Sequence, residues 1–209
     1  DENIIVFNAE TDFVITEGTL TGLSESAVNS INTGTYTGYS IEIPSGVVSI
    51  AANANFESKI DKLVSLKIPN TVTSIGDRAF YNCQNLATDK IVFENDGAEN
   101  LSIGAESFSA PINTGSKFTL HLPDRLNSLG DGAFNRGDLG YVYLPTDVTY
   151  ATGSGTFFNS DAILIFADVA AYEQNFIKTE LSAHAVNMTY PVKITFQPGV
   201  GSSIEETHL

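Results

Sequence analysis

The 209-residue chain contains a single cysteine, Cys83, so no disulfide can form within it. This excludes the small secreted folds that depend on a disulfide network, and packing alone must stabilise the protein. The sequence also lacks any run of about 18 consecutive apolar residues, the length that a membrane-spanning helix requires. A basic, apolar signal peptide does not open it either.

Basic residues are scarce. Ten Lys and Arg residues stand against 25 Asp and Glu residues, which gives a formal net charge of -15. Such a charge repels phosphate backbones and anionic membrane surfaces over the range that salt screening allows. We therefore expect neither nucleic-acid binding nor membrane insertion by this segment. A hydrophobic content of 42% predicts a folded chain that buries a continuous core.

One pattern recurs along most of the chain. Each unit has two apolar residues two positions apart, then proline, then an apolar residue three positions later. Clear copies are IEIPSGVVSIAANANF (41–56), LKIPNTVTSIGDRAF (66–80), LHLPDRLNSLGDGAF (120–134) and VYLPTDVTYATGSGTFF (142–158). A fifth copy, IVFENDGAENLSIGAESF (91–108), lacks the proline and carries an insertion.

The spacing within one unit predicts a short strand followed by a helical turn. Leu66 and Ile68 would share one face of a strand, and Pro69 would end it because proline has no backbone donor. Gly76 follows the second apolar anchor of the unit, where a sharp change of chain direction favours glycine. Residues 79–83 then resume apolar positions at helical spacing.

These short elements cannot bury their apolar faces alone, so the units must stack. Stacking predicts two buried columns of side chains. One contains Ile43, Ile68, Phe93, Leu122 and Leu144, and the other contains Phe80, Phe108, Phe134 and Phe157, with neighbouring phenyl rings in contact.

The string LxxLxIPxxVxxIGxxAFxxC resembles the BspA-like, or treponemal-type, class of leucine-rich repeats. Its residues here are Leu63, Leu66, Ile68, Pro69, Val72, Ile75, Gly76, Ala79, Phe80 and Cys83. The resemblance covers roughly residues 39–166 and implies a right-handed leucine-rich repeat solenoid of about five coils. In this α/β superhelix, short parallel strands would lie on one face, short helical turns would link them, and both ends would be capped.

The resemblance also implies a function. The family occurs mainly in bacterial cell-surface and secreted proteins, often of host-associated microbes, and its usual role is adhesion or protein recognition without catalysis. We therefore expect an extracellular or cell-surface recognition module that binds a host protein or glycan, after removal of a signal peptide. A structural spacer and a targeting domain of a larger modular surface protein remain alternatives. No cofactor is expected.

The ends of the chain differ from the repeats. Residues 1–38 are predicted to form an N-terminal cap, with an alternating segment near Phe13 and a helix running from Leu20 to Ile31. Residues 163–166 are expected to form a last strand. A capping helix would begin at Asp168 within an exit segment of residues 167–190, and the alternating Val192, Ile194 and Phe196 would open a further truncated module or linker over residues 191–209.

Side chains between the buried strand residues should face outward, and in leucine-rich repeats this surface is the concave one. On it we predict an aromatic and basic stripe that binds a ligand, since rigid amphipathic groups are favoured at binding surfaces. The alternative is an ordinary solvated sheet face. The stripe consists of Lys67, Lys90, His121, Tyr141 and Tyr143.

Two further motifs carry a possible function. Arg136-Gly137-Asp138 is a tripeptide that some integrins read; exposure is expected where the coil turns, although Gly and Asp also suit a plain turn. Glu94, Asp96 and Glu99 in the insertion offer carboxylate oxygens, which calcium prefers, but no known calcium-loop pattern surrounds them. Solvation of the loop is the alternative.

Evidence for catalysis is thin. The three histidines, His121, His184 and His208, are scattered, and no HExxH spacing indicates zinc. Cys83 occupies the apolar slot of its repeat, which predicts a buried and inert thiol rather than a nucleophile. We expect no metal site and no enzymatic activity.

Overall fold

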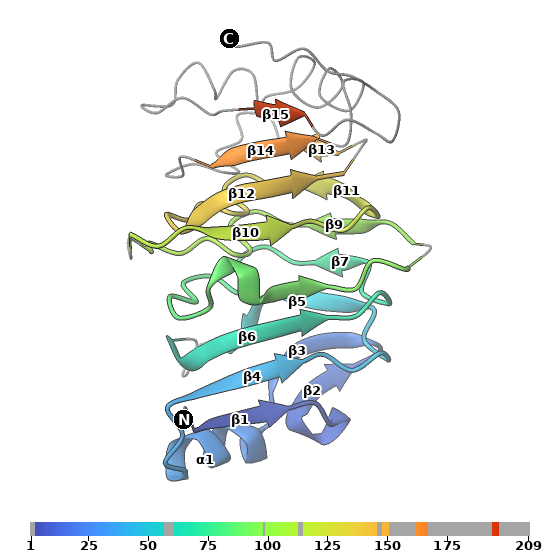
Figure 1. Cartoon of the computed structure of the whole chain (residues 1–209). Coiled ribbons are helices and arrows are strands. Elements are labelled where there is room, and N and C mark those ends of the chain that lie inside the picture. Colours follow the sequence, from blue (N-terminus) through green and yellow to red (C-terminus); the bar gives the residue numbers. More distant parts are fainter. Residues whose placement is uncertain are drawn as a thin grey trace.

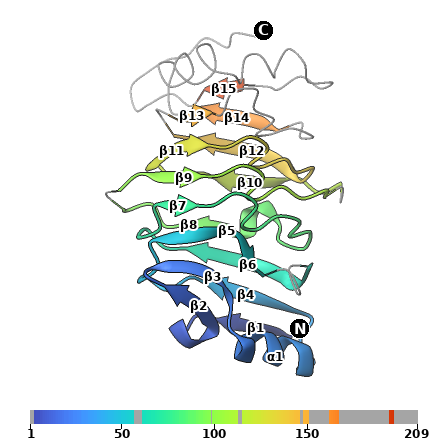
Figure 2. The same ribbon diagram turned by 180° about the vertical axis from the view of Figure 1, so that it is seen from behind.

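The protein is a solenoid whose coils stack along one axis, from β1 at one end to β15 at the other (Figure 1). The computed structural model describes residues 3–56, 61–97, 99–112, 115–145, 148–150, 162–166 and 194–196. The stacking of the coils confirms the predicted repeat solenoid. Its coils contribute strands to two opposite faces, which we call the front face and the back sheet (Figures 1 and 2).

The front face consists of two four-stranded sheets, in which every neighbouring pair of strands is parallel. The first sheet contains β1 (Ile4–Phe7), β4 (Gly38–Glu42), β6 (Leu63–Ile68) and β8 (Ile91–Phe93). The second contains β10 (Phe118–His121), β12 (Leu139–Leu144), β14 (Ile163–Phe166) and β15 (Ile194–Phe196). Backbone pairing is interrupted between β8 and β10, where the unit with the insertion lies.

The back sheet has seven strands and runs through the same coils without interruption (Figure 2). It includes the second apolar anchor of four units, Ile50, Ile75, Ile103 and Leu129, so the prediction of strands on one face only is wrong. Pairing there satisfies backbone groups that a loop would leave to solvent. In sheet order the strands are β13 (Thr149–Tyr150), β11 (Leu126–Leu129), β9 (Leu101–Ile103), β7 (Ser74–Ile75), β5 (Ser49–Asn55), β3 (Thr19–Leu23) and β2 (Phe13–Thr16).

The prediction of a helical turn after Gly76 is wrong, because residues 77–82 form non-helical turns. Arg78, Glu106 and Gly132 occupy the same place in successive coils, and their φ angles of 57°, 51° and 62° are left-handed. A right-handed helix cannot contain such residues. The turn instead directs its backbone N–H groups along the solenoid axis.

Hydrogen bonds between coils take the place of bonds within a helix. The N–H groups of Arg78, Phe80 and Asn82 donate to the carbonyls of residues 105, 107 and 109 in the next coil, each at 2.8 Å. The N–H groups of Glu106 and Phe108 repeat this pattern one coil further on, at 2.8 and 2.9 Å. Parallel pairing therefore continues around the turn that joins the two faces.

The predicted phenylalanine column is confirmed. The rings of Phe80, Phe108 and Phe134 are stacked, with centroids 5.4 and 5.0 Å apart and interplanar angles of 12° and 9°. Phe56 extends the column at 5.1 Å, although its unit carries one more residue before the ring. Phe157 lies outside the described residues. Each fully buried ring contributes roughly 1.5–3 kcal/mol through burial alone.

The predicted strand column is also buried. Ile43, Ile68, Leu122 and Leu144 are each at most 6% exposed, while Phe93 is partly buried and packs against this core. Ile68 and Phe93 are direct partners in the parallel register of β6 and β8.

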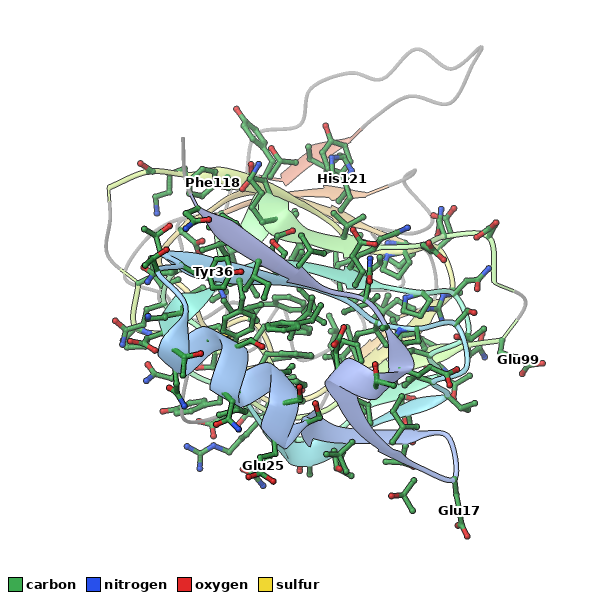
Figure 3. The ribbon with its side chains drawn as sticks, turned by 90° about the horizontal axis from the view of Figure 1, so that it is seen from below. Glu17, Glu25, Tyr36, Glu99, Phe118 and His121 are labelled. Carbon is green, nitrogen blue, oxygen red and sulfur yellow. The ribbon has the colours of Figure 1, made fainter. Side chains whose placement is uncertain are left out.

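At the N-terminal end, β1 joins the front face and β3 joins the back sheet, and α1 (Glu25–Thr33) lies below them (Figures 1 and 3). The prediction of a helix from Leu20 is wrong, since Leu20 and Leu23 are strand residues. The helix begins after Ser24, whose hydroxyl accepts a hydrogen bond from the N–H of Ala27 at 3.3 Å. In the sequence, Ser24 was the residue that could have indicated the start of this helix.

At the other end, the expected strand over residues 163–166 is confirmed as β14. β15 pairs with it in parallel, so residues 194–196 continue the front face rather than stand apart from it. The helix predicted from Asp168 lies outside the described residues.

The glycine that three of the units share, Gly76, Gly104 and Gly130, is required by close packing between coils, not by an unusual backbone angle. A Cβ atom on Gly76 would lie 2.7 Å from the Cα of Ala52 in the preceding coil. A Cβ on Gly104 would lie 2.7 Å from the backbone nitrogen of Asp77, and one on Gly130 would lie 2.7 Å from the Cα of Ala105. Real Cβ atoms do not approach backbone this closely, so the coils would have to separate.

We expect Gly104→Ala to lower the free energy of unfolding by about 1–3 kcal/mol, because it overpacks a contact between two backbones. Urea denaturation measures this. Gly46→Ala is the matched control, since the nearest atom to its added Cβ is a Glu10 carboxylate oxygen at 3.5 Å. Equal stability of the two variants would contradict the role assigned to coil contact.

Candidate functional site

His121 and Tyr143 form an aromatic pair on the front face. They are direct partners in the register of β10 and β12, and their rings are stacked with centroids 4.4 Å apart and planes 9° apart. The centroid separation is close to the spacing of about 4.8 Å between neighbouring strands, so the rings stack along the solenoid axis. Their edges therefore point outward, as Figure 3 shows for His121 at the rim of the molecule.

An open groove of about 320 Å³ adjoins this pair where the front strands end. The groove extends from the end of β8, across β10 and β12, to β14. Its apolar lining includes Leu122, Leu144 and Ile165, each at most 6% exposed. The other lining residues are Phe93, Asn95, His121, Pro123, Asp124, Tyr143 and Pro145.

Tyr141 belongs to the same surface. It lies two residues before Tyr143 on β12, in register with Thr119 of β10 and Ile163 of β14. Its side chain is 49% exposed. The structure thus brings together three of the five residues predicted to bind a ligand, His121, Tyr141 and Tyr143.

The two lysines lie elsewhere. Lys67 is on β6 in the first front sheet, and its ammonium group lies 2.8 Å from the Glu94 carboxylate, whose hydrogen bond raises the pKa of Lys67. Lys90 is not a strand residue but ends η3 (Thr88–Lys90), 3.6 Å from the Asp89 carboxylate. The strand ladder is interrupted between Lys67 and the aromatic residues, whereas η3, which ends at Lys90, packs against β10. Neither lysine lines the groove, and each is paired with a carboxylate.

The three acidic residues of the insertion do not converge. Glu94 pairs with Lys67 and also accepts a hydrogen bond from the N–H of Asn70 at 3.3 Å. Asp96 accepts one from the Asn70 side chain at 3.0 Å, and Glu99 points away from the coils (Figure 3). The described residues hold no cluster of three or more acidic, histidine or cysteine side chains that suits a metal, so the calcium interpretation finds no site there.

Comparison with known families settles the class of the repeat. A model described as BspA type Leucine rich repeat region matches residues 29–164 in six copies. The chain belongs to this family. A comparison with curated proteins gave no match. BspA-type repeats are typically surface-associated modules of protein interaction rather than enzymes. Among the described residues, no helix is long and apolar enough to cross a membrane.

One BspA-type unit contains the predicted integrin tripeptide, and the structure contradicts its exposure. Arg136 and Asp138 are 0% and 1% exposed. The guanidinium forms a two-pronged pair with the Asp138 carboxylate, at 2.9 and 3.1 Å, and also donates to the carbonyls of Phe108 and Leu86. The Gly137 carbonyl accepts a hydrogen bond from the Lys117 ammonium at 2.8 Å. The tripeptide is an internal brace between coils, not a receptor motif.

Asp138 also connects to an earlier coil. Its carboxylate accepts a hydrogen bond from the N–H of Thr88 at 3.1 Å. Burial by itself disfavours the charged carboxylate, but the hydrogen bond and charge of Arg136, together with the Thr88 bonds, outweigh it and lower the pKa of Asp138 below its ordinary value.

Arg125 is a second buried arginine, which the sequence analysis missed. Its guanidinium donates to the carbonyls of Val72 and Pro69 at 2.6 and 3.2 Å and, through Nε, to that of Glu94 at 3.4 Å. It thereby reaches past the irregular BspA-type unit to the regular one before it. In the sequence, the insertion in the intervening unit was the only sign that backbone carbonyls near it would need a side-chain donor.

We expect Asp138→Asn to lower the free energy of unfolding by about 3–5 kcal/mol at neutral pH, because it leaves the buried Arg136 charge without a counter-ion. The wild-type carboxylate has a folded pKa below its unfolded value. It therefore stabilises the fold above the unfolded pKa of about 3.9 and loses this contribution as the pH falls through the folded pKa.

The difference in stability between wild type and Asp138→Asn should accordingly shrink on acidification. Urea denaturation at neutral pH and at a series of acidic pH values measures it. Glu17→Gln, a change at the exposed tip of the turn between β2 and β3, is the control for loss of a carboxylate. A difference that stays constant over the whole pH range would contradict the ionic role of Asp138.

Proposed function

We propose that this chain is a non-catalytic recognition module of a cell-surface or secreted protein, and that it binds a host protein or glycan through the front face. The observation that carries the proposal is the stacked pair of His121 and Tyr143 beside a groove, with Tyr141 exposed next to it. Tyrosine offers a large contact area and a hydrogen-bonding hydroxyl at a low cost in conformational entropy.

The pair is also held in place before any ligand arrives. Both residues are on paired strands, and their mutual stacking contributes about 0.5–1.5 kcal/mol beyond burial. Side chains that are already ordered lose little freedom on binding, which favours affinity. The surface thus meets a basic requirement of a recognition site.

The chemistry of the described residues supports the non-catalytic part of the proposal. Cys83, the only cysteine, is buried within the core, and burial raises the pKa of its thiol above the ordinary value. A reactive thiolate would need the opposite setting. His121 stacks on Tyr143, with the ring centroids 4.4 Å apart.

A second candidate is a rigid spacer or targeting domain of a larger modular surface protein. The continuous phenylalanine stack and the uninterrupted back sheet favour it, because together they join the coils into one stiff body. A spacer would not depend on the aromatic residues of the front face. That difference separates the two candidates by experiment.

We expect the double variant Tyr141→Ala, Tyr143→Ala to lose binding in a screen of the purified protein against host matrix proteins, mucins and glycans. Removing both rings deletes most of the exposed aromatic contact area. Surface-immobilised binding measurements would report the loss, with unchanged melting temperature as the test of folding. Tyr81→Ala is the matched control, because Tyr81 is an exposed tyrosine that stacks with Arg78 away from the groove.

The outcomes separate the candidates. Binding that the double variant loses and Tyr81→Ala retains supports recognition through this face. Binding that survives in the double variant places the site elsewhere. A blank screen for the wild-type protein would favour the spacer.

A further inference from the structure

The dimensions of the groove limit what it can bind. Its lining residues come from the ends of four successive front strands, β8, β10, β12 and β14. The two paired intervals, β10 to β12 and β12 to β14, span about 10 Å at about 4.8 Å each, and the unpaired interval between β8 and β10 adds to this length. An extended peptide rises about 3.4 Å per residue. The groove therefore matches three or more residues of an extended chain that runs along the solenoid axis.

The orientation of the aromatic pair favours a peptide over a sugar. A sugar ring that stacks on an aromatic side chain needs a free ring face. In this pair each ring covers one face of the other, so a sugar finds at most one face of each ring, and the edges of His121 and Tyr143 point outward. These edges carry the imidazole nitrogens and the phenol hydroxyl, which can donate or accept hydrogen bonds to the polar groups of a peptide backbone.

The charge of the groove further limits which peptides it can bind. Asp124 is an exposed lining residue, and it accepts a hydrogen bond from the neutral Asn95 side chain at 2.9 Å. Within the described ranges, no Lys or Arg forms an ion pair with it. Several cations of those ranges are instead paired with other carboxylates, as in Lys67 with Glu94 and Arg78 with Glu106. With a net charge of -15, the surface attracts a cationic partner.

We infer that the groove binds a short extended segment of a basic protein. An arginine or lysine side chain of that segment lies beside Asp124, and an apolar side chain covers Leu122, Leu144 and Ile165. This inference rests on the proposed recognition function and specifies the class of its partner.

The experiment uses a capped tetrapeptide of alternating arginine and leucine, titrated into the whole protein in low-salt buffer and followed by calorimetry or NMR. A peptide with glutamate in place of arginine is the counterpart. We expect measurable affinity for the arginine peptide alone. Tyr143→Ala should weaken it about tenfold, and Asp124→Asn about two- to fivefold, the size typical of an exposed ion pair.

Two controls keep the result specific. Glu17→Gln removes the same charge on the opposite side of the molecule from His121 and should leave the affinity unchanged (Figure 3). Tyr143→Phe keeps the ring and tests the hydroxyl, and it guards against a folding defect in the alanine variant. Added salt should weaken binding of the arginine peptide.

The remaining outcomes overturn the inference in distinguishable ways. Equal affinity for both peptides, lost in Tyr143→Ala, would refute the cationic partner while leaving recognition at this face intact. If Asp124→Asn and Glu17→Gln lowered the affinity for the arginine peptide equally, the peptide would bind by general attraction to the acidic protein and not in the groove. No binding of the arginine peptide would refute the inference, and the screen with the double tyrosine variant would then decide separately whether the recognition function survives.

Discussion

Hydrogen bonding between consecutive coils is the constraint on which the rest of this structure depends. It joins the strands of both faces, and it continues through the turn after each glycine, where alternate N–H groups donate to the next coil. Coils held at strand spacing also bring the phenyl rings to centroid distances of 5.0–5.4 Å. The same spacing leaves no room for a Cβ atom at Gly76, Gly104 or Gly130. Backbone pairing therefore dictates both the aromatic column and the glycine column.

The irregular unit shows what happens where this pairing fails. Its insertion interrupts the front face between β8 and β10, while the back sheet continues. Two buried arginines, Arg125 and Arg136, donate to carbonyls of earlier coils. Long side chains with several donors thus replace part of the missing ladder. A buried charge needs a partner, which Asp138 provides for Arg136.

The interruption also shapes the candidate site. Because β8 and β10 are not paired, Lys67 belongs to a different sheet from the aromatic residues, and its ammonium group is paired with Glu94 of the insertion. Lys90 is outside both sheets, at the end of η3. What remains near the groove is an aromatic pair, an apolar floor and Asp124. The surface is therefore acidic and aromatic rather than basic and aromatic. This charge favours a cationic partner.

The sequence by itself determined the repeat, the two buried columns and the strands of the front face, because apolar spacing acts locally and recurs in every unit, with proline in four of the five. It also placed His121, Tyr141 and Tyr143 on one outward face, since alternation along a strand is a local property. Only the tertiary structure decided the left-handed turns in place of helices, the burial of Arg136 and Asp138, and the ion pair between Lys67 and Glu94. These features depend on which backbone groups the adjacent coil leaves free, and residues up to 56 positions apart in the chain meet there.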